Sequence, residues 1–242
     1  FALCRRVLAR ARQIEDPTER HDLAGRHVVV SAGGTREHLD PVRYLGNRSS
    51  GRQGYALART AAARGAKVTL VAANTALEDP AGVDLVRVIT TADLREAMLA
   101  AVATADAVVM AAAPADFRPA HYARAKIKKS DDSPVPAVEL VRNPDVLAEL
   151  VQRRGAGQVV VGFAAETGDE TGSVLEHGRA KLARKGCDLL VVNEVGDGKA
   201  FDSADNAAVV LGADGTVTEV AHGTKEALAD VVWDLVRARL PG

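Results

Sequence analysis

Beyond residue 26, short apolar runs alternate along the chain with stretches in which apolar residues recur at helical spacing. The first four runs are apolar on both faces, which is typical of parallel strands covered by helices on either side. This alternation predicts an α/β fold built on a Rossmann-like, doubly wound and mostly parallel sheet. The strands are expected at 27–31, 66–73, 84–89, 106–112, 158–165 and 187–193.

Residues typical of helix ends mark the stretches between these strands. Gly65 is expected to end the first helix as a C-cap, and Thr91 to open the second. Asn143-Pro144-Asp145 is expected to start another helix, with proline at its first position. The chain's one tryptophan, Trp233, lies on the apolar side of the last helix and is expected in the core. Helices are expected at about 51–64, 91–104, 171–186 and 224–239.

Two stretches depart from the alternation. Residues 113–142 hold four of the nine prolines and show no helical period. Within them, alternating residues at 125–129 and 138–141 predict two strands separated by a polar turn. An excursion of roughly 30 residues is usually a lid, an interface arm or both. The other departure is a C-terminal hairpin at 206–220, with Asp214-Gly215 as its turn.

The first 24 residues predict a short basic helix broken at Asp16-Pro17, followed by a polar link. Such a helix is too short to be stable alone. We expect a linker or the remnant of a preceding domain at 1–24, and one main domain at 25–242. A helix on a membrane surface is the alternative for 1–24. Because the chain begins with Phe1 rather than Met, a fragment or a processed form is expected.

Composition narrows the classes of function. With 242 residues, the chain can bury a full core as one domain. A net charge of −1 and only 3% aromatic residues give no support to nucleic-acid or membrane-surface binding. No apolar run approaches a membrane-spanning helix, and nothing resembles a secretory signal. Cys4 and Cys187 fit no metal-ligand spacing, so reduced thiols in a cytoplasmic protein are expected.

The densest polar chemistry lies between residues 31 and 54, where a strand leads through a glycine-rich loop into a helix. This arrangement presents backbone N–H groups to a phosphate. In SAGGT (31–35) the glycines favour either approach of a ligand or a tight turn. In NRSSGRQG (47–54) the Ser-Ser-Gly at 49–51 sits where the helix begins and can converge on an anion. A serine N-cap without a ligand is the alternative.

Two residues before that helix can act on a substrate. Asn47 offers a neutral amide that can donate to a developing oxyanion without drawing a nucleophile into an ion pair. Arg43 can bind a phosphate or a carboxylate bidentately. A surface ion pair with Asp40 is the alternative for Arg43.

The segment AAAPADF (111–117) follows the fourth strand, at the edge of a doubly wound sheet where ligands bind. Small residues there let a flat ligand lie against the backbone. Asp116 can accept from a ribose hydroxyl or a base amine, or support a metal; a simple turn aspartate is the alternative.

Lysines supply positive charge at two places. In KIKK (126–129), Lys128 and Lys129 are expected on a solvated face, whereas Lys126 can reach a triphosphate. Lys181 and Lys185 share one helix face and, if they face the same opening, complete an anion pocket. The sequence shows no Ser-His-Asp set, paired carboxylates or metal cluster, which favours chemistry by positioning and charge stabilisation, as in nucleotidyl or phosphoryl transfer.

The motifs SAGGTREHLDPVRYLGNRSSGRQG, AAAPADFRP, KIKK, NPD, GFAAET and FDSADN occur in the order found in phosphopantothenate–cysteine ligases. Over residues 25–240 the chain resembles that family, which in many bacteria forms the C-terminal half of a bifunctional coenzyme A biosynthesis protein. The N-terminal half is a flavin-dependent decarboxylase, so FMN belongs to that half. Residues 1–24 then resemble the connecting segment.

The resemblance implies a two-step reaction. The carboxylate of 4′-phosphopantothenate attacks the α-phosphate of CTP, which releases pyrophosphate and forms an acyl-cytidylate. The amine of L-cysteine then displaces CMP and forms the amide. Mg²⁺ is expected to bridge the phosphates, with Asp116 as the candidate ligand from the protein. The excursion 113–142 resembles the family's dimerisation arm, which covers the active site of the partner subunit, so a homodimer is expected.

The resemblance also implies roles for single residues. Residues matching Arg43 and Asn47 engage phosphopantothenate or the acyl-cytidylate, and Ala113 is expected beside them. Lys126 matches the lysine needed for turnover, whose charge can stabilise the pentacoordinate phosphate and the departing pyrophosphate. Asn47 and Lys126 are therefore the expected catalytic residues. The residues expected at the nucleotide are Ser49, Ser50, Gly51, Met110, Ala111, Ala112, Asp116, Lys126, Asn143, Pro144, Phe163, Lys181 and Lys185.

Three other functions stay open. An ATP-using ligase of the eukaryotic type would share the chemistry. A dinucleotide-dependent reductase would share the fold, although no complete G-x-G-x-x-G follows the first strand. A regulatory homologue would bind the ligand without turnover. The chain departs from the family at Phe117, where a tyrosine is frequent, so no hydrogen-bonding role is expected for that side chain.

Overall fold

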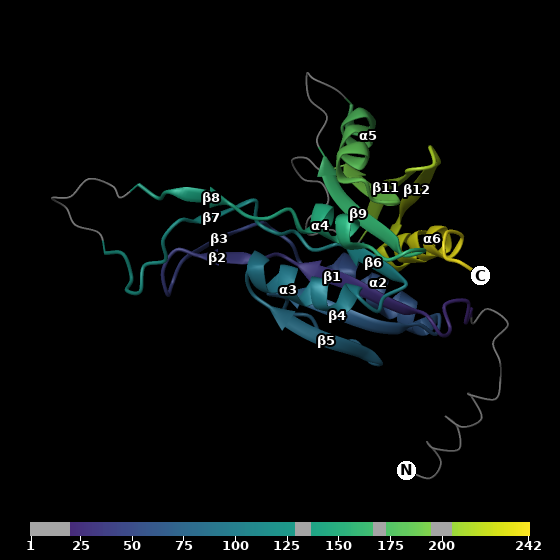
Figure 1. The fold of residues 1–242 in the computed structure, drawn as a ribbon, viewed down its shortest axis with the longest axis horizontal. Helices are drawn as coiled ribbons and strands as arrows, with labels where there is room; N and C mark the ends of the chain where they lie inside the picture. The colour runs from purple at the N-terminus through teal and green to yellow at the C-terminus, as the bar shows by residue number, and fades with distance from the viewer. Residues whose placement is uncertain (1–19, 129–136, 167–172, 195–204) are drawn as a thin grey trace, which may run out of the picture.

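The computed structural model describes residues 20–128, 137–166, 173–194 and 205–242. In these residues eight strands form one sheet in the order β12-β11-β10-β9-β6-β1-β4-β5 (Figure 1). The six strands from β10 to β5 in this order run parallel, β11 is antiparallel to β10, and β12 is antiparallel to β11. The mostly parallel sheet predicted from the apolar runs is confirmed. The strands are β1 His27–Gly33, β4 Lys67–Ala73, β5 Val83–Val88, β6 Ala107–Met110, β9 Val159–Glu166, β10 Leu189–Glu194, β11 Asp205–Gly212 and β12 Val217–Thr224.

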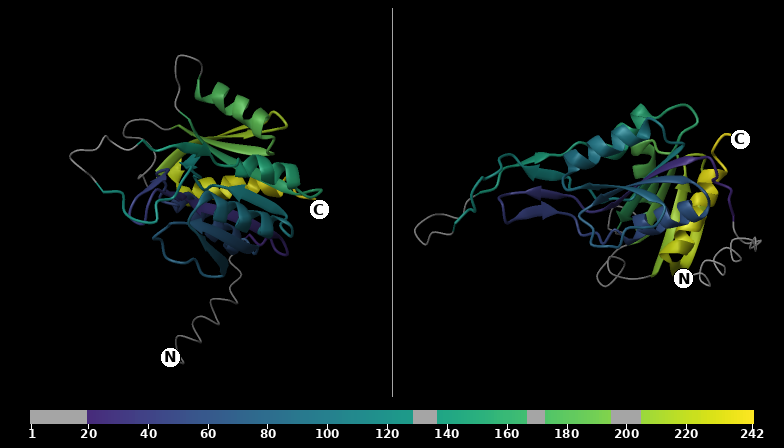
Figure 2. Two further views of the ribbon diagram at one scale, coloured as in Figure 1. Left: turned by 60° about the vertical axis from the view of Figure 1, so that its left-hand side comes forward. Right: turned by 90° about the horizontal axis from the view of Figure 1, so that it is seen from below.

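Helices cover both faces of the sheet, as Figures 1 and 2 show. One face packs against α2 (Arg52–Ala63) and α6 (Lys225–Arg237), and the other against α3 (Thr91–Val102), α4 (Val146–Arg153) and α5 (Val174–Lys185). We call the sheet and these helices the body. Alternate residues of β1 face the two layers, because side chains on a strand alternate between its faces. Val28 and Val30 lie in the α2/α6 core, whereas Val29 lies in the other.

The core positions predicted for the last helix are confirmed. Trp233 of α6 has no exposed surface, and its indole Nε1 donates to the carbonyl oxygen of Leu57 in α2 at 2.9 Å. A buried tryptophan needs such an acceptor. The C-terminal hairpin is also confirmed, since β11 and β12 flank a turn at Asp214 and Gly215, where the glycine has φ of +85°.

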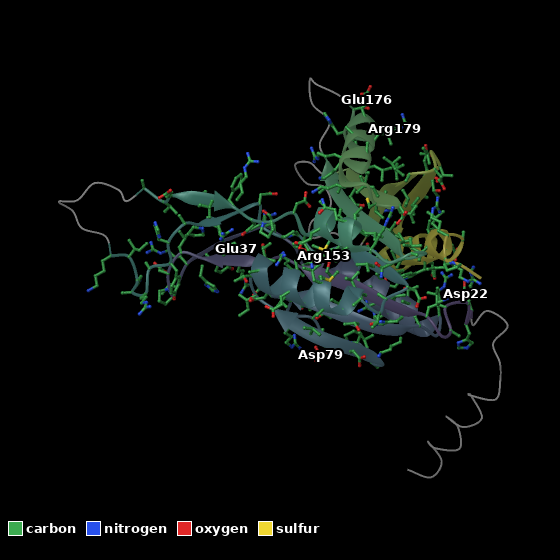
Figure 3. The ribbon with its side chains drawn as sticks, viewed as in Figure 1. Asp22, Glu37, Asp79, Arg153, Glu176 and Arg179 are labelled. Carbon is green, nitrogen blue, oxygen red and sulfur yellow. The ribbon has the colours of Figure 1, made fainter. Side chains whose placement is uncertain are left out.

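One predicted helix start is confirmed and another differs. α3 begins at Thr91 as predicted, and the residue that caps it is Thr90, in a capping box with Asp93. The Thr91 hydroxyl instead donates to the buried carboxylate of Glu37 at 2.8 Å, and the backbone N–H of Thr91 donates to the same oxygen. Figure 3 shows Glu37 beside α3. The cap of α4 is Asp145, so Pro144 precedes the helix instead of occupying its first position.

The excursion after β6 forms an arm together with residues 36–46, for which the sequence did not predict any strand. β2 (Arg36–His38) and β3 (Tyr44–Gly46) form a hairpin, and β7 (Phe117–Pro119) pairs with β8 (Leu140–Arg142). We call residues 36–46, 117–128 and 137–142 the arm, and Figures 1 and 2 show it projecting from the body. The strand predicted at 125–129 is wrong for 125–128, and residue 129 lies outside the described residues. The strand predicted at 138–141 corresponds to β8.

The first described residues pack onto the body beside α6. Leu23 is fully buried, and the guanidinium of Arg64, which is 4% exposed, pairs with Asp22 and Asp234 at 2.6 and 2.8 Å (Figure 3). Burial alone would lower the pKa of Arg64, but the two carboxylates raise it above its usual value. The basic helix predicted before them lies outside the described residues. Within the described residues, no helix has the length and hydropathy needed to cross a membrane.

Candidate active site

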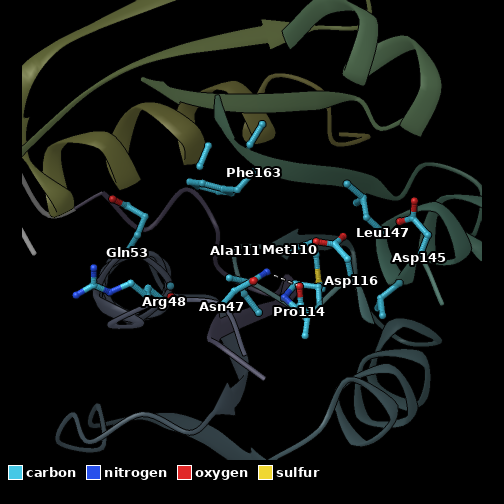
Figure 4. A pocket seen from close by; sticks show the side chains of 18 of the residues that line it. Asn47, Arg48, Gln53, Met110, Ala111, Pro114, Asp116, Asp145, Leu147 and Phe163 are labelled. Atoms are coloured by element: carbon cyan, nitrogen blue, oxygen red, sulfur yellow. Dashed lines mark hydrogen bonds between the residues drawn. The ribbon is translucent and has the colours of Figure 1, made fainter. Parts of the chain in front are cut away.

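A cavity of about 790 Å³ opens at the carboxyl ends of the parallel strands. Its walls come from the segment before α2, the loop after β6, the segment before α4, and α5, with Phe163 of β9 among them (Figure 4). Strand order reverses between β1 and β6, because the chain continues from β1 to β4 on one side and returns to β6 on the other. Ligands bind in doubly wound sheets at such a reversal.

Most of the residues singled out from the sequence meet in this cavity, although they come from five separate segments of the chain. Arg43 and Lys126 are the exceptions, and neither lines it. The roles of these residues in binding stay predictions. The residues brought together are Asn47, Ser49, Ser50, Gly51, Met110, Ala111, Ala112, Ala113, Asp116, Asn143, Pro144, Phe163, Lys181 and Lys185.

The first pair of glycines, Gly33 and Gly34, allows close packing of the backbone and does not serve the approach of a ligand. A Cβ on Gly33 would lie 2.0 Å from the carbonyl oxygen of Ala73, and a Cβ on Gly34 would lie 2.5 Å from that of Asn47. Neither glycine lines the cavity. Of the two roles left open for SAGGT, the structure supports the tight turn, which lets the end of β4 and the segment at Asn47 approach this backbone closely.

The start of α2 differs from a serine cap. Gly51 is the N-cap, in a left-handed conformation with φ of +77°, and it has no side chain to cap the helix. The Ser49 hydroxyl oxygen instead accepts from the N–H of Gly51 at 3.4 Å. Arg52, Gln53 and Gly54 of the first turn line the cavity. The N–H groups of a helix's first turn lack intrahelical acceptors and favour an anion, so this wall is suited to a phosphate.

Asn47 is oriented by one hydrogen bond. Its Nδ2 donates to the carbonyl oxygen of Pro114 at 2.9 Å, which Figure 4 marks by a dashed line. Because a carbonyl oxygen only accepts, this contact determines which end of the amide is the NH₂ group. The amide carbonyl and the second N–H hydrogen of Asn47 remain to contact a substrate in the cavity. The neutral donor expected from the sequence is thus held against the loop after β6.

Hydrogen bonds hold the loop after β6 along the end of β1. The N–H of Ala112 donates to the Ser31 hydroxyl at 3.1 Å, and that of Ala115 donates to the Thr35 hydroxyl at 2.8 Å. From the other side, Nδ2 of Asn143 donates to the carbonyl oxygen of Ala115 at 2.9 Å. These bonds hold a row of small residues as a flat wall that ends at Asp116.

Positive charge lines the opposite wall. Lys181, Arg184 and Lys185 of α5 all face the cavity. Lys185 pairs with the carboxylate of Asp145, the cap of α4. Partial burial would raise the pKa of Asp145, but the bonds from Lys185 and from the N–H of Ala148 outweigh it and hold that pKa below its usual value. Lysines at this wall can contact the phosphates of a nucleotide.

Arg43 and Lys126 lie in the arm. The guanidinium of Arg43 binds Asp40 through Nε at 2.9 Å, and its Nη2 donates to the carbonyl oxygen of Ile127 at 2.8 Å. The ion pair considered as the alternative for Arg43 therefore forms, although Asp40 is fully buried. Lys126 is exposed and stands one residue before this contact.

The cavity lining also contains residues that were not predicted as site residues, and three of them are the polar residues Gln53, Asn193 and Lys225. They come from α2, β10 and α6, and Nε2 of Gln53 donates to the carbonyl oxygen of Lys225 at 3.0 Å. A signal existed for Lys225, because a lysine in the first turn of a helix opposes the helix dipole. Its side chain is largely buried.

The residues at the cavity fit a divalent cation that is bound mainly by substrate. No group of three or more His, Cys, Asp or Glu side chains able to hold a metal occurs in the described part of the chain. Mg²⁺ commonly binds through one or two carboxylates together with substrate phosphates and water. Asp116 supplies one carboxylate at the cavity, and Asp145 is engaged by Lys185.

Comparison with known proteins relates this site to a family. The profile described as "DNA/pantothenate metabolism flavoprotein C-terminal domain" matches residues 23–240. The chain belongs to this family. The match covers the body, the arm and every cavity residue described above. The phosphopantothenate–cysteine ligase resemblance seen in the sequence is thereby confirmed at the level of the family.

Relatives support the assignment to the DNA/pantothenate metabolism flavoprotein C-terminal domain family. The coenzyme A biosynthesis bifunctional protein CoaBC of Mycobacterium bovis is 56% identical over 228 residues, which are 92% of this chain and 54% of that protein. Its counterpart in Vibrio parahaemolyticus is 40% identical over 89% of this chain and 53% of its own length. The chain thus spans about half the length of these curated relatives.

A solved member of the family has the same fold. The crystal structure of the C-terminal domain of a coenzyme A biosynthesis bifunctional protein CoaBC superposes with a TM-score of 0.75 at 32% identity. The match covers 90% of this chain and 97% of that one. The α/β fold with a mostly parallel sheet and antiparallel C-terminal strands is therefore shared.

Proposed function

We propose that this chain is a phosphopantothenate–cysteine ligase that uses CTP in coenzyme A biosynthesis. The observation that carries the proposal is the cavity, which the start of α2 and the cationic residues of α5 line together with Asn47 and Asp116. Both anion-binding walls suit a nucleoside triphosphate, and the neutral amide suits an acyl group. The names of the curated relatives place them in coenzyme A biosynthesis, which supports the same conclusion.

The reaction proceeds in two displacements. A carboxylate oxygen of 4′-phosphopantothenate attacks the α-phosphorus of CTP, the bond from that phosphorus to the bridging oxygen breaks, and pyrophosphate leaves with its electron pair. The amine of L-cysteine then attacks the acyl carbon, the bond from that carbon to the oxygen bridging to phosphorus breaks, CMP leaves with that oxygen, and the amine loses a proton. Both steps develop negative charge on oxygen, so positioned donors and cations accelerate them.

Five of the predicted residues have a role in this scheme. The second N–H of Asn47 donates to the acyl oxygen as charge develops, while its first remains on Pro114. Lys181 and Lys185 bind the triphosphate, and Lys126 stabilises the departing pyrophosphate. Asp116 would hold Mg²⁺, which when bound neutralises phosphate charge and polarises the α-phosphate. Binding of the triphosphate competes with Asp145 for Lys185.

Lys126 is proposed to act in the cavity of a second copy. In its own chain Lys126 stands in the arm and does not line the cavity. The arm exposes six large apolar side chains, a concentration that is typical of protein interfaces. A homodimer would cover these side chains and bring one arm over the partner's cavity. They are Val42, Tyr44, Phe117, Tyr122, Val138 and Leu140.

The longer parent protein is also a proposal. Because the curated relatives are about twice as long as the matched region, we propose that this domain follows a flavin-dependent decarboxylase, which alone would bind FMN. Nucleic acid and membranes are not proposed as partners. The cytoplasmic location stays a prediction.

The residue that follows β4 disfavours the alternative of a dinucleotide-dependent reductase. Dinucleotide-binding sheets place an acidic residue there to bind the ribose hydroxyls. This chain has Asn74 after β4, and its Nδ2 donates to the carbonyl oxygens of Gly34 and Ile89 at 2.9 and 2.8 Å. The side chain at this position joins two loops and is not placed for a ribose.

One experiment separates the remaining functions. The chain is incubated with 4′-phosphopantothenate, L-cysteine, Mg²⁺ and either CTP or ATP, and pyrophosphate and the amide product are measured. Release with CTP supports the proposal, whereas release only with ATP refutes the CTP assignment. Binding of both substrates without any product would instead indicate a regulatory homologue.

A further inference from the structure

Asp40 lies in the turn between β2 and β3, and its carboxylate has no exposed surface. Oδ1 accepts from the backbone N–H groups of Val42 and Arg43, both at 2.8 Å. Oδ2 accepts from the Arg43 guanidinium and from the backbone N–H of Ile127 at 3.2 Å. A buried carboxylate is stable only when its lone pairs are satisfied, and here donors surround both oxygens.

The contacts of Asp40 join two parts of the arm that are far apart in sequence. The Arg43 guanidinium donates to the carbonyl oxygen of Ile127, while the N–H of Ile127 donates to Asp40. The N–H of Ala123 also donates to the carbonyl oxygen of Leu39 at 3.0 Å. The β2–β3 hairpin and the segment that carries Lys126 are thus held together around one carboxylate.

We propose that Asp40 is a positioning residue that holds Arg43 and the Lys126–Ile127 backbone in one fixed arrangement. The kinetic consequence rests on the proposed function, together with the substrate contact that the family resemblance implies for Arg43. Arg43 would then present its free face to the substrate while Asp40 prevents its side chain from turning away. Lys126 would project from a backbone that is anchored at the next residue.

The charge of Asp40 is essential to this role. Bonds from Arg43, together with those from three backbone N–H groups, hold the pKa of Asp40 well below its usual range, so the group stays ionised at neutral pH. An asparagine there would keep the shape. One of its two polar atoms would become a donor facing other donors. Depending on the orientation of the amide, either the contacts with the Arg43 guanidinium and Ile127 or those with the N–H groups of Val42 and Arg43 would be lost.

The first test measures the arrangement without using activity. Trypsin cleaves after lysine, and the bond between Lys126 and Ile127 contains the N–H that Asp40 accepts. In Asp40→Asn, brief native digestion followed by mass spectrometry should show this cut about tenfold faster, because cleavage tracks local opening. The matched control is Asp22→Asn, which removes the same kind of carboxylate from Arg64 at the far end of the body. It should leave the rate at Lys126 unchanged.

The second test measures catalysis with CTP, 4′-phosphopantothenate and L-cysteine. Asp40→Asn should lower kcat by about 100-fold, the scale that misplacement of a catalytic group costs, with little change in the KM for CTP. Asp22→Asn should keep the wild-type constants. In the double variant Asp40→Asn/Arg43→Gln, the fold-reduction in kcat should be smaller than the product of the reductions in the two single variants. Both substitutions disrupt the same arrangement of side chains, so their effects are not additive.

The outcomes separate this inference from the proposed function. An unchanged tryptic rate at Lys126 in Asp40→Asn overturns the positioning role, whatever the enzyme's activity. Faster cleavage together with wild-type kcat also overturns it. A wild-type chain that releases no pyrophosphate refutes the proposed function alone. If Asp40→Asn does not fold, Arg43→Lys serves instead, since it keeps the charge and loses the forked contact; slower or equal cleavage there overturns the inference.

Discussion

The body buries most of its large apolar side chains, whereas the arm exposes six of its own. Trp233, Tyr55 and Leu57 have no exposed surface, but Val42 is 61% exposed and Tyr122 is 55% exposed. The body is stabilised by two apolar cores. In the arm, polar contacts dominate instead: the buried carboxylates of Asp40 and Glu37 gather donors from distant segments.

This contrast indicates that the body and the arm are stabilised in different ways. The body is stabilised by burial of its own apolar side chains, because burial of apolar surface dominates the stability of a folded protein. The arm gains shape from polar contacts while leaving apolar side chains to be covered by another molecule. Substrate binding is then expected to depend on the body, and turnover on the arm of a second copy.

Truncation of the body's largest core residue should have the largest effect. Trp233→Ala removes a fully buried side chain and its bond to Leu57, which should cost about 3–5 kcal/mol of unfolding free energy. Urea denaturation followed by circular dichroism measures the loss. Tyr122→Ala in the arm is the control and should change stability little. An equal loss in both variants would contradict the division between body and arm.

Loss of the proposed catalytic groups should lower activity and leave the fold intact. Lys126→Ala and Asn47→Asp should each reduce amide formation by about 10²–10³-fold, the cost of removing one group that stabilises charge in the transition state. Mixing the two variants should restore part of the activity if Lys126 acts in the partner's cavity. Wild-type rates in both single variants would refute the assigned roles.

Polar substitution on the arm should weaken dimer formation. The double variant Tyr44→Ser/Phe117→Ser removes two apolar side chains that are each 47% exposed in the single chain. The dissociation constant from sedimentation equilibrium should rise about 10–100-fold, since full burial of such a side chain contributes about 1.5–3 kcal/mol and only about half of each remains to be buried in the dimer. Val86→Ser, on the exposed face of β5, should leave it unchanged. A monomeric wild type would refute the homodimer.

The smallest effect concerns pH. Because Arg43 lowers the pKa of Asp40 in the folded state below the unfolded value of 3.8, the ionised carboxylate stabilises the fold above that value. This contribution should be lost as pH falls below about 4 towards the folded pKa. The stability difference between wild type and Asp40→Asn should be constant from pH 6 to 8 and shrink in acid. A difference that grows in acid would contradict the ionised state of Asp40.

Periodicity predicted the body well because its strands are long apolar runs and its helices end at recognisable residues. It missed β2 and β3, whose three residues each are too few to show alternation. It also placed a strand at 125–129, where alternating lysines mark a segment that is held by the side chain of Asp40. A contact between residues so distant in sequence leaves no local pattern.

Prediction of the candidate site from the sequence is limited in the same way, because local patterns do not report contacts between distant segments. Strand ends and the matched motifs identified most of the cavity, since the topology of the sheet brings those ends together. Gln53 and Lys225 were missed because they meet only through the packing of α2 against α6. Asn193 was missed because nothing local in β10 marks it as a cavity residue. Sequence patterns also gave no indication that Asp40 would be buried.

The most direct test of the ligase mechanism is to omit L-cysteine. With CTP, Mg²⁺ and 4′-phosphopantothenate alone, the chain should release pyrophosphate in a single turnover and hold the acyl-cytidylate. CMP should appear only when L-cysteine is added, in step with the amide. If no pyrophosphate is released until L-cysteine is present, the two-step mechanism is contradicted.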